Sequence, residues 1–188
     1  MASGKGVSGV GASDAGWREW VVAGALVERA DHLLLVRNER RGGVTDWSTP
    51  GGVIDHTDPS LLGGLGREVE EETGLTVTAW QGPLYEVHAV APDLGWSMRC
   101  EVHRAVAFGG ALRVADPDGI VVDAQFVPHH ECPDRLSGCA RWVGEPLGDW
   151  LSQRWGPVDA RAYRYTVHGT SRSDLRVVRT GIDGVESP

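Results

Sequence analysis

The sequence predicts an α+β fold in which helices pack on one mixed sheet. Strand-type and helix-type segments follow one another without the strict alternation that produces a doubly wound parallel sheet. The chain has 188 residues, enough for one domain with a sizeable core, and its 41% hydrophobic and 23% charged content is ordinary for a globular protein. We therefore expect one main domain with short additions at its ends.

Composition divides the chain into three parts. Residues 1–16 consist mostly of Gly, Ser and Ala and predict a disordered lead-in. Residues 17–155 contain the main domain, and residues 156–188 form an extension. Two β-type runs around a polar stretch predict a β-hairpin over residues 160–181. Because an isolated hairpin is marginally stable, we expect it to pack on the domain or to pair with a second subunit in a homodimer.

Apolar runs of β type predict the strands of the sheet. The first two, Val21–Glu28 and His32–Arg37, are separated by a polar turn and predict a hairpin. Later runs show the partial alternation of strands with one buried face. These runs span residues 75–80, 84–90, 97–108 and 120–127. A short helix is expected near residues 144–155.

One longer helix is predicted between Asp58 and Gly74. Asp58 can cap its start, Pro59 suits the first turn, and Gly74 suits the left-handed position after the last turn. Gly63 and Gly64 lie inside it and cost about 1 kcal/mol each relative to Ala. The first turns are therefore the weakest part of this helix.

Three glutamates gather on one side of this helix. At 3.6 residues per turn, Glu68, Glu71 and Glu72 fall within an arc of roughly 100° beside the apolar Leu65 and Val69. They lie in the last turns, where the helix dipole disfavours negative charge and the carboxylates repel one another. A solvated acidic face is the alternative interpretation. A bound cation would remove the repulsion, and oxygen ligands of this kind favour magnesium or manganese.

The loop before the helix adds a specific signal. The Gly51-Gly52 turn is followed by Asp58 and by the run REVEEETGL over residues 67–75. Together they resemble the Nudix box, and this run matches the second half of that signature at every fixed position. The first half departs from it, because Asp58 replaces the first glutamate, Thr57 replaces a glycine, and one residue is added before Arg67. We expect the added residue to bulge between Asp58 and Leu62 and residues 67–73 to stay helical.

The resemblance covers roughly residues 18–152 and implies a Nudix-type α/β/α sandwich with hydrolase activity on a nucleoside diphosphate linkage. By position it implies that Glu68, Glu71 and Glu72 bind Mg²⁺ or Mn²⁺, with the Gly52 carbonyl as a further ligand. Arg67 would orient the acidic cluster. The substrate we favour is a nucleoside triphosphate, intact or oxidised. ADP-ribose or another nucleoside-diphosphate sugar is the first alternative, and a regulatory Nudix-like domain without catalysis is the second.

A general base is expected near the glutamates. Family members often take it from the helix or from a loop before a late strand, and here that loop contains Asp116 and Asp118. Asp118 is our candidate, and Glu68, Glu101 and Asp123 are the alternatives. An ordinary Asp-Pro-Asp-Gly turn would also account for these residues.

Two tryptophans are candidates for contact with a base. Trp47 and Trp96 fall in expected loops, where an indole ring could stack on the substrate, whereas most of the eight tryptophans are expected in or near the core.

Charge and composition exclude several other functions. The net charge of −8 disfavours binding to nucleic acid or to an anionic membrane. No apolar run approaches a membrane span, and the N-terminus lacks the apolar stretch of a signal peptide, so a cytoplasmic protein is expected. The three cysteines are too few for a disulfide framework, and their spacing from histidines matches no zinc ribbon or finger.

Overall fold

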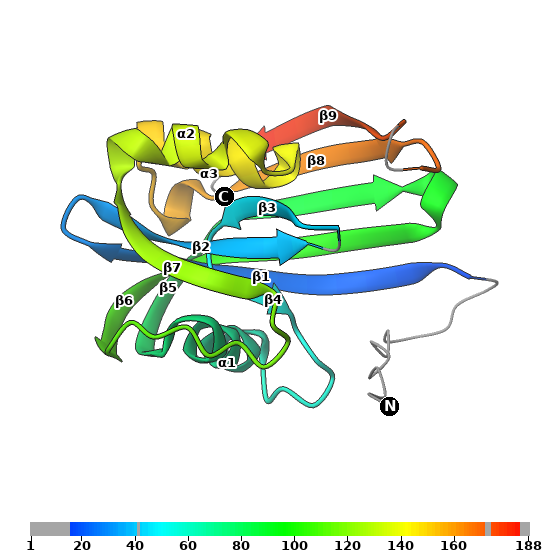
Figure 1. Ribbon diagram of the computed structural model, residues 1–188. Coiled ribbons are helices and arrows are strands. Elements are labelled where there is room, and N and C mark those ends of the chain that lie inside the picture. Colours follow the sequence, from blue (N-terminus) through cyan, green and yellow to red (C-terminus); the bar gives the residue numbers. More distant parts are fainter. Residues whose placement is uncertain (1–15, 41, 172–173, 185–188) are drawn as a thin grey trace, which may run out of the picture.

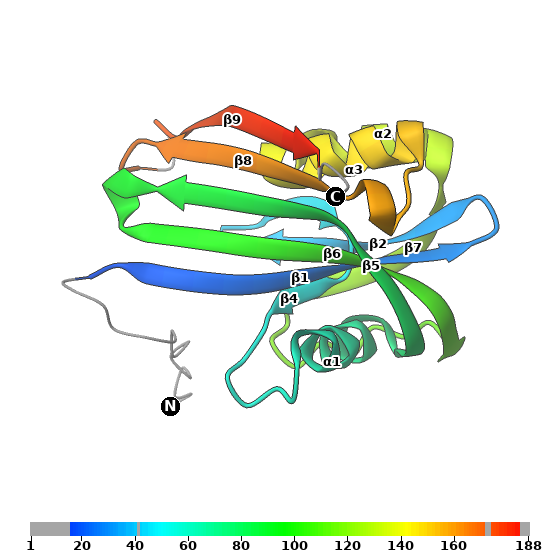
Figure 2. The same ribbon diagram turned by 180° about the vertical axis from the view of Figure 1, so that it is seen from behind.

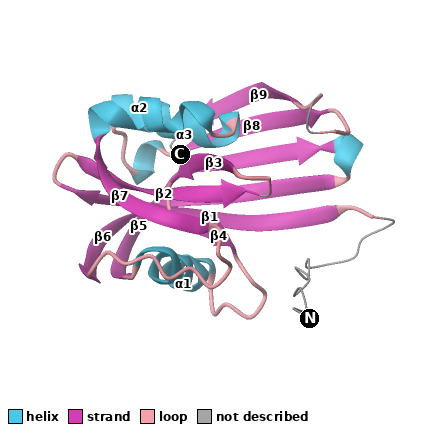
Figure 3. Cartoon of the chain, in the orientation of Figure 1, coloured by secondary structure: helices cyan, strands magenta, loops and turns pink. Residues whose placement is uncertain are grey.

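The computed structural model describes residues 16–40, 42–171 and 174–184 (Figure 1). The predicted disordered lead-in lies outside these ranges except for Gly16. One mixed sheet lies between two layers of helices, as Figure 1 and, from behind, Figure 2 show. Helix α1 (Leu61–Thr73) covers one face, and α2 (Cys132–Arg135) and α3 (Arg141–Gln153) cover the other (Figure 3). The predicted α/β/α sandwich is therefore confirmed.

Nine strands form the sheet, in the order β3-β2-β1-β6-β5-β8-β9, with β4 beside β1 and β7 beside β2. Only β1–β6 and β5–β8 are parallel pairs among the described strands. The strands are β1 (Arg18–Arg29), β2 (His32–Arg40), β3 (Val44–Ser48), β4 (Gly51–Val53), β5 (Leu75–Ala91), β6 (Trp96–Gly110), β7 (Val121–Pro128), β8 (Arg161–His168) and β9 (Arg176–Gly184). In the described part of the chain, four 3₁₀ turns lie between the strands and helices: η1 (Pro92–Leu94), η2 (His129–Glu131), η3 (Leu136–Gly138) and η4 (Pro157–Asp159).

Both predicted hairpins form. Strands β1 and β2 are antiparallel around the turn, with Arg29 opposite His32. Strands β8 and β9 are antiparallel as well, and β8 continues the sheet by pairing with β5. The C-terminal hairpin therefore packs on the main domain of its own chain. The predicted strands 75–80 and 84–90 are instead one strand, β5, whose register shifts between Gln81 and Tyr85.

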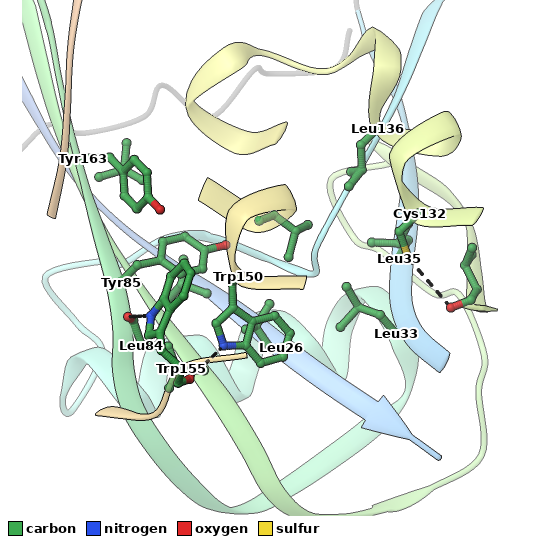
Figure 4. Close-up of a cluster of buried hydrophobic side chains, with 14 of the residues drawn as sticks. Leu26, Leu33, Leu35, Leu84, Tyr85, Cys132, Leu136, Trp150, Trp155 and Tyr163 are labelled. Carbon is green, nitrogen blue, oxygen red and sulfur yellow. Dashed lines mark hydrogen bonds between the residues drawn. The ribbon is translucent and has the colours of Figure 1, made fainter. Parts of the chain in front are cut away.

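Alternation along the strands builds a separate core on each face of the sheet. In β1, Leu26 faces α3, whereas Ala25 and Val27 face α1 with Leu65 and Val69 of that helix. The α3 side contains the larger core, shown in Figure 4. There the Trp155 indole donates to the Leu84 carbonyl at 2.7 Å, and the Trp150 indole donates to the Trp155 carbonyl at 3.2 Å.

The two predicted helices begin at other residues than expected. Ser60, rather than Asp58, caps α1, and its hydroxyl accepts from the Gly63 amide at 3.0 Å. Pro59 therefore precedes the helix. Gly74 ends it in the left-handed conformation, φ 72°, as predicted. Helix α3 begins at Arg141, earlier than the predicted residue 144. Among the described residues, no helix is long and apolar enough to cross a membrane.

Candidate active site

Helix α1 brings its carboxylates against the loop between β3 and the helix. Glu72 is only 8% exposed, and its Oε2 accepts from the Gly51 amide at 2.9 Å. Burial raises the pKa of Glu72 to about 8, and this amide opposes the rise. Gly52 lies against Glu68, because a Cβ added to this glycine would be 2.6 Å from the Glu68 Oε2. The glycine turn and the acidic helix face therefore form one site.

Arg67 holds the remaining carboxylates of the cluster together. Its Nη1 lies 2.8 Å from the Glu68 Oε1 and 3.0 Å from the Glu71 Oε2. Burial raises the pKa of Glu68, and Arg67 counteracts this effect. The Glu71 carboxylate adds repulsion that raises the pKa values of both Glu68 and Glu72. Three carboxylates, of which Glu72 is buried and the other two are half-buried, thus share the positive charge of one guanidinium.

These oxygen groups have the chemistry that a divalent cation requires. Carboxylates and backbone carbonyls are the ligands that Mg²⁺ accepts in proteins, and a cation would offset the repulsion that raises their pKa values. Across residues 16–40, 42–171 and 174–184, however, no three or more His, Cys, Asp or Glu side chains are arranged so that they could hold a metal ion. Arg67 lies between Glu68 and Glu71, so these side chains must turn to share a metal. The carboxylates and the Gly52 carbonyl are therefore suitable ligands for Mg²⁺. In this structure the Glu68 and Glu71 carboxylates are oriented toward Arg67.

The loop before β7 approaches the same cluster. The Asp116 carboxylate accepts from the amides of Asp118 (3.0 Å), Ile120 (2.7 Å) and Val121 (2.8 Å), so Asp116 organises an Asp-Pro-Asp-Gly turn. The negative charge of Asp118 raises the pKa of Glu68, and that of Asp116 raises the pKa of Glu72. The turn thus places its acidic side chains near the helix.

The other candidate bases are engaged elsewhere. Glu101 on β6 pairs with Arg99 at 2.7 Å and with His103 at 3.0 Å. Asp123 on β7 accepts from the Ala124 amide at 2.9 Å and from the Gln125 side chain at 2.7 Å. Asp118, by contrast, lies close enough to the cluster for its negative charge to raise the pKa of Glu68.

A cavity of about 290 Å³ opens on the α3 side of the sheet, and Gly51 lies on its wall. Its lining combines apolar strand residues with a few polar groups from β2, the end of β3 and the β3–β4 turn. The lining residues are Val22, Ala23, Gly24, Arg40, Ser48, Thr49, Gly51, Tyr85, Val87, Met98, Cys100, Val102, Trp142 and Val143. Gly51 thus contacts the buried Glu72 through its amide and borders the cavity as well.

Comparison with known proteins agrees with this arrangement. The NUDIX domain model matches residues 18–145, which is more than half of the chain. The chain belongs to the NUDIX family. This membership confirms the predicted family, its sandwich fold and its enzyme class, a Nudix hydrolase. No curated protein sequence matches the chain.

Solved structures share the Nudix fold. A MutT protein from Bacillus halodurans has a TM-score of 0.63 at 20% identity, over 90% of this chain and 99% of that chain. A MutT NUDIX hydrolase from Burkholderia pseudomallei has a TM-score of 0.57 at 27% identity, over 68% of this chain and 97% of that chain. The NUDIX domain of Shewanella oneidensis NrtR, complexed with ADP ribose, has a TM-score of 0.59 at 18% identity, over 73% and 89% of the two chains.

The unusual first half of the Nudix box has a structural explanation. Asp58 makes a two-point contact with Arg67, with Nε–Oδ1 at 3.0 Å and Nη2–Oδ2 at 3.1 Å, and Arg67 lowers the pKa of this carboxyl. The added residue is absorbed before Leu61, so α1 runs without a break through Arg67–Thr73, as predicted. Asp58 also packs against the helix at Gly64, where a Cβ would lie 2.6 Å from its Oδ2.

The tryptophans expected to contact a base lie in strands, not in loops. Trp47 belongs to β3, and the Arg135 guanidinium lies 5.0 Å from its ring. Trp96 begins β6 and meets Trp142 edge to face at a centroid distance of 6.2 Å. Neither side chain lines the cavity, whereas Trp142 does. No local pattern in the sequence identifies Trp142, because the cavity is created by strands from distant parts of the chain.

Proposed function

We propose that this Nudix enzyme is a magnesium-dependent hydrolase that cleaves the diphosphate linkage of a nucleoside triphosphate, intact or oxidised. One observation carries the proposal: Gly51 joins the acidic face of α1 to the cavity. A nucleotide could therefore place its phosphates at the carboxylates and its nucleoside in the cavity. Binding at both places would position the linkage for attack.

The phosphate end of the site is proposed to use the carboxylates of α1. Glu68, Glu71 and Glu72, with the Gly52 carbonyl, would hold Mg²⁺ or Mn²⁺. The bound metal supplies positive charge that neutralises the phosphate oxygens and favours ionisation of the attacking water. Arg67, anchored by Asp58, orients Glu68 and Glu71.

Asp118 is proposed to accept the proton of the attacking water. It lies in a turn organised by Asp116 and its charge acts on Glu68, so a carboxylate is available beside the cluster. A general base must lie within hydrogen-bond reach of the water it activates, directly or through one further water.

The nucleoside end is proposed to use the cavity. Ligand pockets span about 300–1,000 Å³, so a cavity of about 290 Å³ lies near the lower end of this range and suits a single nucleoside. Trp142 offers an indole ring for stacking, and Tyr85, Ser48 and Thr49 offer hydroxyl groups to the base or sugar.

ADP-ribose or another nucleoside-diphosphate sugar is the second candidate. The NUDIX domain of Shewanella oneidensis NrtR binds ADP ribose and shares this fold. A non-catalytic regulatory domain is less consistent with the three glutamates of α1, Glu68, Glu71 and Glu72, all of which are present.

A panel assay tests the proposal. The purified protein is incubated with Mg²⁺ and with the common and 8-oxidised nucleoside triphosphates, ADP-ribose and nucleoside-diphosphate sugars, and released phosphate and pyrophosphate are measured. We expect turnover of at least one triphosphate and its loss with a chelator. Turnover of ADP-ribose alone would shift the assignment to the second candidate. Binding of a nucleotide without turnover of any member would favour the regulatory domain.

A further inference from the structure

The first turn of α3 forms one wall of the cavity that we assign to the nucleoside. Trp142 and Val143 lie in this turn and line the cavity. The Trp142 ring rests edge to face on Trp96 at the start of β6. The position of this turn therefore determines how much room the cavity offers to a base.

Local interactions hold this turn weakly. The carbonyl of the N-cap residue Ala140 accepts from the Val143 and Gly144 amides at 2.8 and 3.0 Å, but Ala140 adds no side-chain capping bond of the kind that Ser or Asp would provide. Gly144, Pro146 and Gly148 follow inside the helix, and Gly and Pro lower helix stability. A second cavity of about 270 Å³ lies behind the helix, lined by Gly144 and by Leu136 of η3. The turn needs another anchor.

The C-terminal hairpin supplies this anchor through Glu145. The Tyr165 hydroxyl of β8 donates to the Glu145 Oε2 at 3.1 Å, and Arg179 of β9 lies 3.4 Å from the same oxygen. The Arg141 Nε donates to the Glu145 Oε1 at 2.7 Å. Arg141 also donates from Nη1 to the Val177 carbonyl of β9 at 2.6 Å. The two charged residues of the first helical turns are thus tied to both strands of the hairpin.

We propose that the β8–β9 hairpin is a specificity-determining part of the active site. Through Glu145 and Arg141 it fixes the first turn of α3, and so it sets the position of Trp142 in the cavity. Both strands lie beyond residue 145, where the NUDIX domain match ends. The inference rests on the proposed function, because that function assigns the nucleoside to this cavity. Glu145 acts as a positioning residue, since it lies on the helix and not in the lining.

The test compares a nucleotide probe with a probe that has no base. Methylene-bridged ATP and GTP report binding at both ends of the site, and inorganic tripolyphosphate reports binding at the carboxylates alone, all measured by calorimetry with Mg²⁺. We expect Glu145→Ala to weaken binding of the preferred nucleotide analogue about tenfold and to leave tripolyphosphate binding unchanged. Glu145→Gln keeps an acceptor for Tyr165 and should recover most of the affinity. In turnover, Glu145→Ala should raise KM and leave kcat within about threefold.

Asp149→Ala is the matched control. Like Glu145, Asp149 ties α3 to β8 without lining the cavity, because it accepts from the Tyr163 hydroxyl at 3.1 Å, but it lies about two helical turns after Trp142. It should lower the melting temperature and leave the affinity for the nucleotide analogue unchanged. An equal loss of affinity in Asp149→Ala, or unchanged affinity in Glu145→Ala, would overturn the inference while the proposed function stands. A wild-type protein that neither binds the analogues nor hydrolyses a triphosphate would overturn both.

Discussion

Gly51 shows how a single residue can serve two parts of the site. Its φ of 138° lies in the region that glycine favours, and a Cβ there would be 2.2 Å from the Ala23 carbonyl oxygen. Only glycine can therefore bring the turn this close to β1. That approach directs the amide to Glu72 and leaves the same residue on the cavity wall.

Loss of one carboxylate should reduce catalysis while the fold survives. We expect Glu71→Gln or Glu72→Gln to lower kcat about 10²-fold or more, because charge stabilisation by a metal contributes several kcal/mol and each 1.36 kcal/mol changes the rate about tenfold. Without metal, the melting temperature should hold or rise, because Glu71→Gln removes a repelling charge and Glu72→Gln removes a buried carboxyl whose pKa burial raises to about 8. Glu70→Gln, on the exposed side of the same helix, is the control for turnover. Near-wild-type turnover of both variants at low magnesium would contradict the metal assignment.

The role of Asp118 predicts a different response from that of its neighbour in the turn. We expect Asp118→Asn to lower kcat by about 10²-fold with little change in melting temperature, because it removes the base and leaves the turn intact. Asp116→Asn should lower the melting temperature, because three amides lose a charged acceptor. Steady-state kinetics and thermal unfolding of both variants check this. An unchanged kcat in Asp118→Asn would contradict the assignment of Asp118 as the general base and would favour Glu68 in that role.

At the scale of secondary-structure elements, α1 combines poor helix formers with close contacts. Gly63 and Gly64 weaken the helix, yet each allows the preceding loop to lie on it: added Cβ atoms would be 2.7 Å from Pro59 and 2.6 Å from Asp58. Asp58 is fixed by Arg67 and cannot move aside easily. The two glycines thus lower the intrinsic stability of α1 and allow the loop with Asp58 and Pro59 to pack against it.

The contact of Asp58 with Gly64 predicts opposite effects for two Gly-to-Ala substitutions in α1. Gly66→Ala meets no atom within 4 Å and should stabilise the protein by about 1 kcal/mol, because Ala is the better helix former. Gly64→Ala should lower the melting temperature and the activity, because its Cβ collides with Asp58. Thermal unfolding of the two variants is the measurement. Equal stabilisation by both would show that Asp58 does not pack on Gly64.

In the whole molecule, one sheet continues through the proposed catalytic domain and the C-terminal hairpin. Strand β8 pairs with β5, and its Tyr163 and Tyr165 are 0% and 1% exposed in the core beneath α3. The stability of the domain and the position of α3 therefore depend on residues beyond the NUDIX domain match.

Truncation after Pro157 should accordingly cost stability before it changes the chemistry of α1. Burial of one large apolar side chain contributes about 1.5–3 kcal/mol, and a domain has only about 5–15 kcal/mol of net stability. Removal of Tyr163, Tyr165 and Val167 should therefore lower the melting temperature by more than 10 °C, roughly, or prevent folding. Circular dichroism and size-exclusion chromatography check this. A truncated chain with the wild-type melting temperature and oligomeric state would show that the hairpin is dispensable.

The sequence by itself determined the features that depend on neighbouring residues. The arc of Glu68, Glu71 and Glu72 follows from the helical period, and the hairpins follow from paired apolar runs around polar turns. The Nudix box was recognisable in spite of Asp58, because its second half is one continuous segment.

Only the tertiary structure decided the features that join distant segments. The Asp58 carboxylate binds Arg67, nine residues further along the chain, and so it does not cap α1. Ser60 caps the helix in its place. The cavity brings together β1, β2, the β3–β4 turn, β5, β6 and α3, so no local pattern could indicate Trp142. The same holds for Glu145, whose partners on β8 and β9 lie far along the chain. Periodicity places side chains on one element, whereas long-range pairing of strands decides which elements meet.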